Sequence, residues 1–144
     1  MDWNDKMLSL ADTVASFSKD RRTKVGAVIA DTDNSVVSTG YNGFPRGADD
    51  DIDSRHSPER KLLYTEHAER NAIFNAAKNG SSVNGCTMYL RWFPCVDCAR
   101  AIIQSGISHI VCSAPDFEHP KWGASFVVAN ELMMECGIWI EYYE

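Results

Sequence analysis

Apolar residues recur along the chain with two spacings, one typical of helices and the other typical of strands. Residues 3–17 carry an apolar side chain about every three or four positions, which predicts an amphipathic helix. Short β-branched runs at 25–31 and 36–41 flank a polar turn and predict the two strands of a hairpin. The same criteria predict helices at 67–79, 95–105 and 125–135, and strands at 86–91, 107–113 and 138–143.

The order of these elements is α-β-β-α-β-α-β-α-β, and it determines the expected architecture. From the third strand onward, strands alternate with helices, which favours parallel crossovers with helices on both faces of one sheet. We therefore predict an α/β fold, a three-layer α/β/α sandwich with a mixed five-stranded sheet. The length is typical of one domain, so we expect residues 1–144 to form a single domain.

Residues 42–65 follow neither pattern. They contain two glycines, two prolines and, between positions 49 and 53, a cluster of four aspartates. We expect a long loop with a short helical turn after Ser57. Loops of this length inside a compact domain are usually functional or disordered.

The charge and hydropathy of the chain narrow the classes of function. The net charge is −6 and the pI is about 5.1, whereas nucleic-acid-binding proteins usually carry a basic surface. No apolar run approaches the length of a membrane span, and the acidic N-terminus does not resemble a secretory signal. We expect a soluble, cytoplasmic protein that binds neither membranes nor nucleic acid.

Two of the five cysteines need a specific explanation. Cys95 and Cys98 form a C-x-x-C pair directly after Pro94, whereas the other three cysteines lie in or beside apolar runs and are typical of small buried residues. The odd number argues against a disulfide framework. A C-x-x-C pair alone is compatible with a structural zinc site, a redox pair or two buried thiols.

The sequence His67-Ala68-Glu69 favours a catalytic zinc site. A catalytic zinc ion keeps three protein ligands and one open position, and His67, Cys95 and Cys98 supply such a set. His67 begins one predicted helix and the Cys95–Cys98 pair begins another, and the positive partial charge at a helix N-terminus favours thiolates. Glu69 is offset from the ligand direction and suits a catalytic acid and base. H-x-E followed by P-C-x-x-C is the signature of zinc deaminases, so we predict one Zn²⁺ per chain.

With these motifs the chain resembles the cytidine and deoxycytidylate deaminase superfamily, and most closely its deoxycytidylate (dCMP) deaminases. The block Gly-Tyr-Asn-Gly-Phe-Pro-Arg-Gly at 40–47 and the long loop after it are the more specific features. The resemblance implies hydrolysis of dCMP to dUMP with release of ammonia, a homo-oligomer (dimer or hexamer), and, as in some relatives, regulation by dCTP and dTTP. The matching segments are 18–20, 23–29, 40–47, Tyr64, 67–73, 93–98 and 102–107.

The resemblance also assigns substrate contacts. It implies that Asn42 contacts the sugar, that the backbone of Ala68 reads the pyrimidine edge and that Thr23 contacts the nucleotide. Tyr64 and Phe93 are further candidates, although Phe93 is equally typical of a strand-end core residue. The 5′-phosphate requires cations. The candidates, each otherwise a solvated surface charge, are Lys19, Arg21, Arg22, Lys24 and Arg46.

Three alternatives share the metal motif. They are a deaminase of another small pyrimidine nucleotide, a deaminase of cytosine or adenine in nucleic acid, and a catalytically silent zinc-binding module. Glu69, which a structural zinc site does not need, counts against the last. Some relatives hold a second, structural zinc with cysteines before the H-A-E motif, but residues 1–85 here contain no cysteine.

Overall fold

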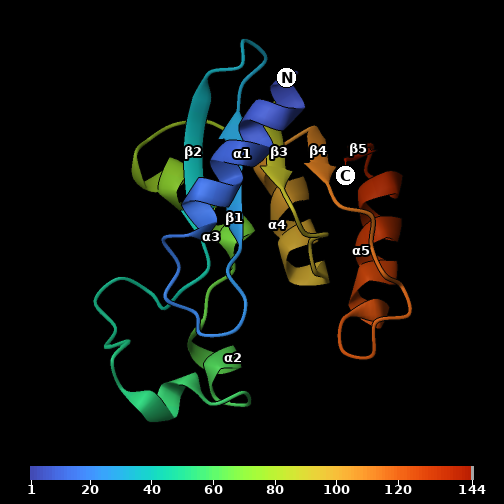
Figure 1. The fold of residues 1–144 in the computed structure, drawn as a ribbon. Helices are drawn as coiled ribbons and strands as arrows, with labels where there is room; N and C mark the ends of the chain where they lie inside the picture. The colour runs from blue at the N-terminus through green and yellow to red at the C-terminus, as the bar shows by residue number, and fades with distance from the viewer. Residues whose placement is uncertain (144) are drawn as a thin grey trace.

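The structure is a computed structural model that describes residues 1–143 of the 144-residue chain. Five α-helices, one short 3₁₀ helix and five strands lie in this range (Figure 1). The helices are α1 (Trp3–Ala15), η1 (Asp53–His56), α2 (Lys61–Tyr64), α3 (Ala68–Lys78), α4 (Val96–Ser105) and α5 (Gly123–Glu135). The strands are β1 (Gly26–Ala30), β2 (Val36–Tyr41), β3 (Thr87–Leu90), β4 (His109–Cys112) and β5 (Trp139–Tyr142).

The five strands form one mixed sheet in the order β2-β1-β3-β4-β5. Strand β1 runs antiparallel to both of its neighbours, β2 and β3, whereas β3, β4 and β5 are parallel. The hairpin and the βαβ crossovers inferred from the element order are therefore both present. The predicted mixed five-stranded sheet is confirmed.

Helices cover both faces of this sheet, and the alternation of side chains along β1 shows why. Ala27 and Ile29 belong to the core beneath α3, α4 and α5, while Val28 and Ala30 pack with buried residues of α1. Successive strand residues point to opposite faces, so a strand that is buried throughout can serve two cores. Figure 1 shows α1 crossing one face, with α3 and α4 on the other. The three-layer arrangement is confirmed.

The strand register brings the starts of two helices to the same end of the sheet. Tyr41 pairs with Gly26, and Leu90 pairs with Ala27, so β2 and β3 both finish at the end where β1 begins. An isolated bridge between Gly43 and Glu66 returns the chain to that end just before α3. Helix α4 begins there as well, shortly after β3. Side chains at the two helix starts can therefore meet.

The segment 42–65 is more ordered than a simple loop. The predicted helical turn after Ser57 is confirmed as α2, and η1 precedes it. Acidic residues of the segment pair with the basic stretch before β1: Asp50 with Lys19 and Asp53 with Arg21. Elsewhere the predicted elements are present, with ends that agree or differ by at most two residues. Among the described residues, no helix is both long and apolar enough to span a bilayer.

A close contact between β2 and α3 makes Gly40 sensitive to substitution. A Cβ atom at Gly40 would lie 2.3 Å from the backbone nitrogen of Ala72 and 2.5 Å from the carbonyl oxygen of Ala68. Because both are backbone atoms, the helix itself would have to move. We expect Gly40→Ala to lower the free energy of unfolding by roughly 3 kcal/mol, measured by urea denaturation.

Gly43→Ala is the matched control for that measurement. A Cβ there would meet only a side-chain carbon of Tyr41 at 4.0 Å, and Gly43 has no positive φ. We expect it to change the unfolding free energy by less than about 1 kcal/mol. Equal effects of the two substitutions would show that the β2–α3 contact is not the source of the loss.

Candidate active site

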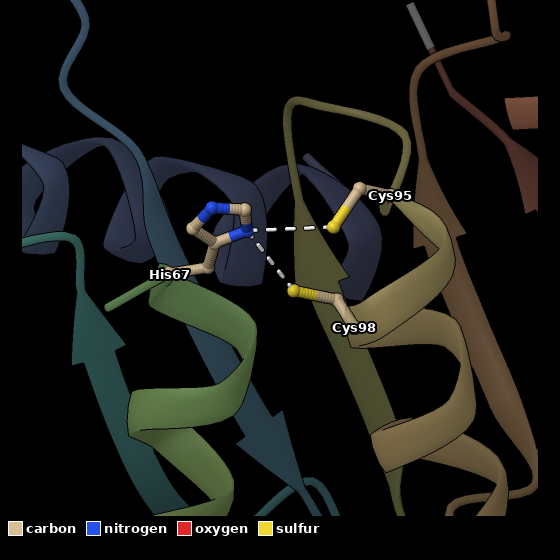
Figure 2. A group of neighbouring side chains, drawn as sticks. All are labelled: His67, Cys95 and Cys98. Carbon is tan, nitrogen blue, oxygen red and sulfur yellow. Dashed lines mark hydrogen bonds between the residues drawn. The ribbon is translucent and has the colours of Figure 1, made fainter. Parts of the chain in front are cut away.

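Three metal-binding side chains converge where α3 and α4 begin (Figure 2). His67 is the residue that caps α3, and Cys95 caps α4, both with extended backbone conformations. Cys98 follows one turn into α4 and is fully buried. The Nδ1 atom of His67 lies 3.4 Å from the Cys95 sulfur and 3.3 Å from the Cys98 sulfur. Residues 28 and 31 positions apart therefore share one site.

The donor atoms fit a zinc ion in both type and spacing. All three lie within 4.8 Å of one another. Tetrahedral zinc with ordinary Zn–N and Zn–S bonds places a ligand nitrogen and sulfur about 3.5 Å apart, close to the distances found here. Two sulfurs and one imidazole nitrogen are preferred zinc donors, and three protein ligands leave one position open. The group can hold one metal ion of the catalytic type.

The electrostatics of the site favour a thiolate at Cys95. A hydrogen bond from the Cys98 thiol is the main cause that lowers the pKa of Cys95 to about 4, and His67 adds to it. The same Cys95–Cys98 contact, together with burial, raises the pKa of Cys98. The hydrogen bond with Cys95 also raises the pKa of His67, against the opposing effect of burial. The three groups thus favour a negative charge on the Cys95 sulfur, at a position that suits a cation.

Glu69 lies beside this group in the first turn of α3. Its side chain is buried, with 5% of its surface exposed, and it lines the cavity next to His67 and Cys95. Burial raises the pKa of the Glu69 carboxyl. A buried carboxyl group whose pKa is raised holds a proton more readily than an exposed one, so it can release a proton as well as accept one, as a catalytic acid and base must.

The site opens into a cavity of about 630 Å³, which is large enough for a small organic ligand. One end is formed by the segment before β1, the start of the 42–65 segment, and α2. The other end is formed by the residues after β3 and by the loop between β4 and α5. The cavity is therefore bounded by the loops at the end of the sheet where α3 and α4 start.

Four of the predicted substrate contacts line this cavity: Thr23, Asn42, Ala68 and Phe93. Asn42 also has a structural role, because its Oδ1 accepts from the backbone of Val25 and its Nδ2 donates to the Thr23 carbonyl. One N–H and one lone pair of the amide remain for a ligand. Phe93 packs edge to face against Phe126, so its side chain is also part of the core.

The structure does not bring the other predicted contacts to the cavity. Lys19 and Arg21 pair with the acidic segment, and Arg46 contacts Asn75 on α3. Tyr64 stacks with Phe44, and its hydroxyl accepts a hydrogen bond from Arg60. The predicted contacts that are absent from the cavity wall are Lys19, Arg21, Arg22, Lys24, Arg46 and Tyr64.

The substrate contacts predicted from the sequence do not include the residues that form the far end of the cavity. His119, Lys121 and Trp122 lie in the loop between β4 and α5, and the ring of Trp122 meets the ring of His67 edge to face at 6.3 Å. The order of strands and helices in the sequence is the feature that could have indicated them. Ligand sites lie beyond the carboxyl ends of parallel strands, so the loop after β4 belongs beside the one after β3 that holds the cysteines.

A buried carboxylate beside three zinc-binding side chains, on a mixed sheet with a cavity at the helix starts, defines a zinc-dependent deaminase site. Comparison with known proteins agrees with this class. Residues 1–114 match the family model described as cytidine and deoxycytidylate deaminase zinc-binding region. The chain belongs to the cytidine and deoxycytidylate deaminase family.

Individual relatives place the chain within this family. It is 39% identical over 138 residues to an uncharacterized deaminase of Aliivibrio fischeri, covering 94% of this chain and 90% of that protein. It is 43% identical over 116 residues to mouse deoxycytidylate deaminase, covering 77% of this chain and 64% of the mouse protein. The chain thus spans somewhat less than two thirds of the mouse relative's length.

A solved structure supports the fold. The dCMP deaminase of cyanophage S-TIM5, crystallised with dCMP and dUMP, superposes with a TM-score of 0.76. The match covers 96% of this chain and 95% of the phage chain, at 23% identity. At this identity the likeness concerns the fold, which is the mixed five-stranded sheet with its helices.

Proposed function

We propose that this chain catalyses the hydrolytic deamination of dCMP to dUMP, with release of ammonia. The observation that carries the proposal is the buried carboxylate of Glu69, which lies beside the zinc-binding group in the wall of a nucleotide-sized cavity. The names of relatives add support. The mouse relative is a deoxycytidylate deaminase, and the phage structure contains dCMP and dUMP.

The residues of the chain have separate tasks in this reaction. A zinc ion held by His67, Cys95 and Cys98 would activate a water molecule by lowering its pKa. Glu69 takes a proton from the attacking water and delivers it to the ring nitrogen next to the amine-bearing carbon. It then takes the remaining proton from the hydroxyl group on the attacked carbon and passes it to the amine, which leaves as ammonia while the hydroxyl oxygen becomes the carbonyl oxygen of uracil. We predict that the backbone of Ala68, which lines the cavity, reads the pyrimidine edge.

Ammonia release from a panel of substrates tests the proposal. The panel consists of dCMP, dCTP, cytidine, deoxycytidine and a transfer RNA, each assayed with the zinc-loaded protein. We expect kcat/KM to be highest for dCMP and to exceed that for cytidine and deoxycytidine by at least about tenfold, since these two lack the phosphate and one charge-assisted contact accounts for such a factor. Faster release from the transfer RNA, or no release from any substrate, would contradict the proposal.

The expectations about assembly, regulation and location remain part of this proposal. We predict a homo-oligomer, dimeric or hexameric, and exposed apolar side chains on the outer faces of α3 and α5 support an interface. These are Phe74, Val127, Val128 and Met134. Regulation by dCTP and dTTP and a cytoplasmic location likewise stay predictions, which follow from the resemblance to the family and from the amino-acid composition, respectively.

A further inference from the structure

Several basic side chains line the cavity, and two of them, Lys61 and Arg91, form ion pairs with carboxylates of the chain. Lys61 contacts both carboxylate oxygens of Asp20 at 3.0 Å, and both side chains are largely buried, at 17% and 7% exposure. Arg91 makes two parallel hydrogen bonds, of 3.0 and 2.9 Å, to Asp12 on α1. In the structure, the charge of each cation is balanced by a carboxylate of the chain itself.

Lys121 differs from these two. Its side chain is exposed at the cavity wall, and none of the ion pairs found within residues 1–143 includes it. Its Nζ atom lies 5.1 Å from the ring centre of Trp122, which in turn contacts the ring of His67. Lys121 therefore places a positive charge that forms no ion pair, among the residues described, one aromatic ring away from the metal-binding group.

His119 presents a hydrogen-bond donor at the same end of the cavity. Its Nδ1 atom accepts from the backbone N–H groups of Lys121, at 3.1 Å, and Trp122, at 3.0 Å. Because Nδ1 is an acceptor in both bonds, the proton of the neutral ring is on Nε2. The loop leads directly into α5, whose N-terminal dipole adds positive potential.

These features match one class of ligand group, a phosphate monoester, which carries close to two negative charges at pH 7 and accepts several hydrogen bonds. We propose that Lys121 and His119 hold the 5′-phosphate of the substrate. This inference rests on the proposed function, because it assigns the phosphate of that same nucleotide. The β4–α5 loop, and not the basic segment before β1, then selects a nucleotide over a nucleoside.

Asp116 is the acidic residue of this loop that also lines the cavity. One of its carboxylate oxygens accepts from the backbone N–H of Glu118 at 3.0 Å, which holds it to its own loop. A carboxylate near the phosphate opposes binding of the dianion but not of the nucleoside. Asp116→Asn should therefore raise the preference for dCMP over deoxycytidine, the opposite direction from loss of Lys121.

Two substitutions separate the phosphate contact from loop structure. Lys121→Ala removes the charge from an exposed side chain. His119→Asn removes the Nε2 donor while the Asn Oδ1 keeps an acceptor near the position of Nδ1 for the two backbone N–H groups. Lys78→Ala is the matched control, since Lys78 is an exposed lysine on α3 that does not line this cavity.

The measurement is kcat/KM for dCMP and for deoxycytidine in each variant. We expect Lys121→Ala to lower kcat/KM for dCMP about 10- to 100-fold, with His119→Asn smaller but in the same direction. The values for deoxycytidine should change by less than about twofold, and Lys78→Ala should change neither. An unchanged dCMP preference in both variants overturns the proposal. The proposal is also overturned if Arg21→Ala or Arg46→Ala, rather than the two loop variants, removes the preference for dCMP over deoxycytidine.

Binding of the product provides a readout that does not depend on turnover. Calorimetry with dUMP and deoxyuridine should show tighter binding of dUMP by wild type, and Lys121→Ala should remove most of that difference. If wild type releases ammonia from no substrate, the proposed function fails, and the dUMP result still decides on the phosphate site. If wild type prefers dCMP but dUMP binds Lys121→Ala as tightly as wild type, only the phosphate assignment fails.

Discussion

Replacing Glu69 by glutamine is expected to lower kcat for dCMP by about three orders of magnitude, while the protein keeps its fold and its zinc. Glutamine has nearly the same shape and remains buried at the start of α3, but it cannot take a proton from water. Glu69 is not among the three residues that could hold the metal. The measurements are steady-state ammonia release, zinc content by atomic emission, and thermal unfolding.

Thermal stability should not fall in this variant, because an amide is less costly to bury than a carboxylate. Glu66→Gln is the matched control, since Glu66 lies three residues away and does not line the cavity. Its carboxylate pairs with Arg70 at 3.3 Å and accepts from the backbone of His67, so a modest loss of stability is expected there. Turnover by Glu69→Gln within tenfold of wild type would refute the proton-carrier role.

The zinc ligands could be predicted from sequence because their chemistry is local. Each ligand stands at or near the first residue of a helix, and helix starts are marked by apolar periodicity that can be read in the sequence. Only the meeting of the two helix starts is a tertiary fact, and the H-x-E and P-C-x-x-C motifs together already indicate it. The sheet could be predicted in the same way, from the alternation of strands and helices along the sequence.

The cation assignments were harder to predict because pairing is decided across the chain. Lys19 and Arg21 look free in the sequence, yet their partners Asp50 and Asp53 lie 31 and 32 residues away. The sequence shows the four aspartates between positions 49 and 53 as a cluster, but it does not show which basic residues pair with them. Conversely, Lys121 stands beside no obvious motif, and its position in the cavity follows from the loop after β4 meeting the loop after β3.

Asn42 illustrates a different limit. The family resemblance implies a substrate contact, and the side chain does line the cavity. However, its amide also joins the Val25 N–H to the Thr23 carbonyl, and its own carbonyl accepts from the buried Ser18 hydroxyl. Loss of activity in an Asn42 variant would therefore combine substrate contact with the shape of the loop before β1. Motif matching cannot separate the two roles, whereas the hydrogen bonds show that both exist.

Replacing Cys98 by alanine is expected to abolish zinc binding and reduce activity to background. Cys98 is one of only three side chains that could hold the ion within residues 1–143, and removing a ligand leaves two. Zinc content should fall from one per chain to near zero. Because an ion that binds only the folded state stabilises it, added zinc should raise the melting temperature of wild type but not of this variant.

Cys112→Ala separates the loss of a ligand from the loss of a buried sulfur. Cys112 is as fully buried as Cys98, with 0% exposure for both, but it does not belong to the metal-binding group. Both substitutions remove the same atom from a packed interior, so the packing loss should be similar, about 1 kcal/mol. We expect Cys112→Ala to retain zinc, activity and stabilisation by zinc. If Cys98→Ala binds zinc as wild type does, the ion is held elsewhere; if both variants lose it, packing around the site rather than ligation decides metal binding.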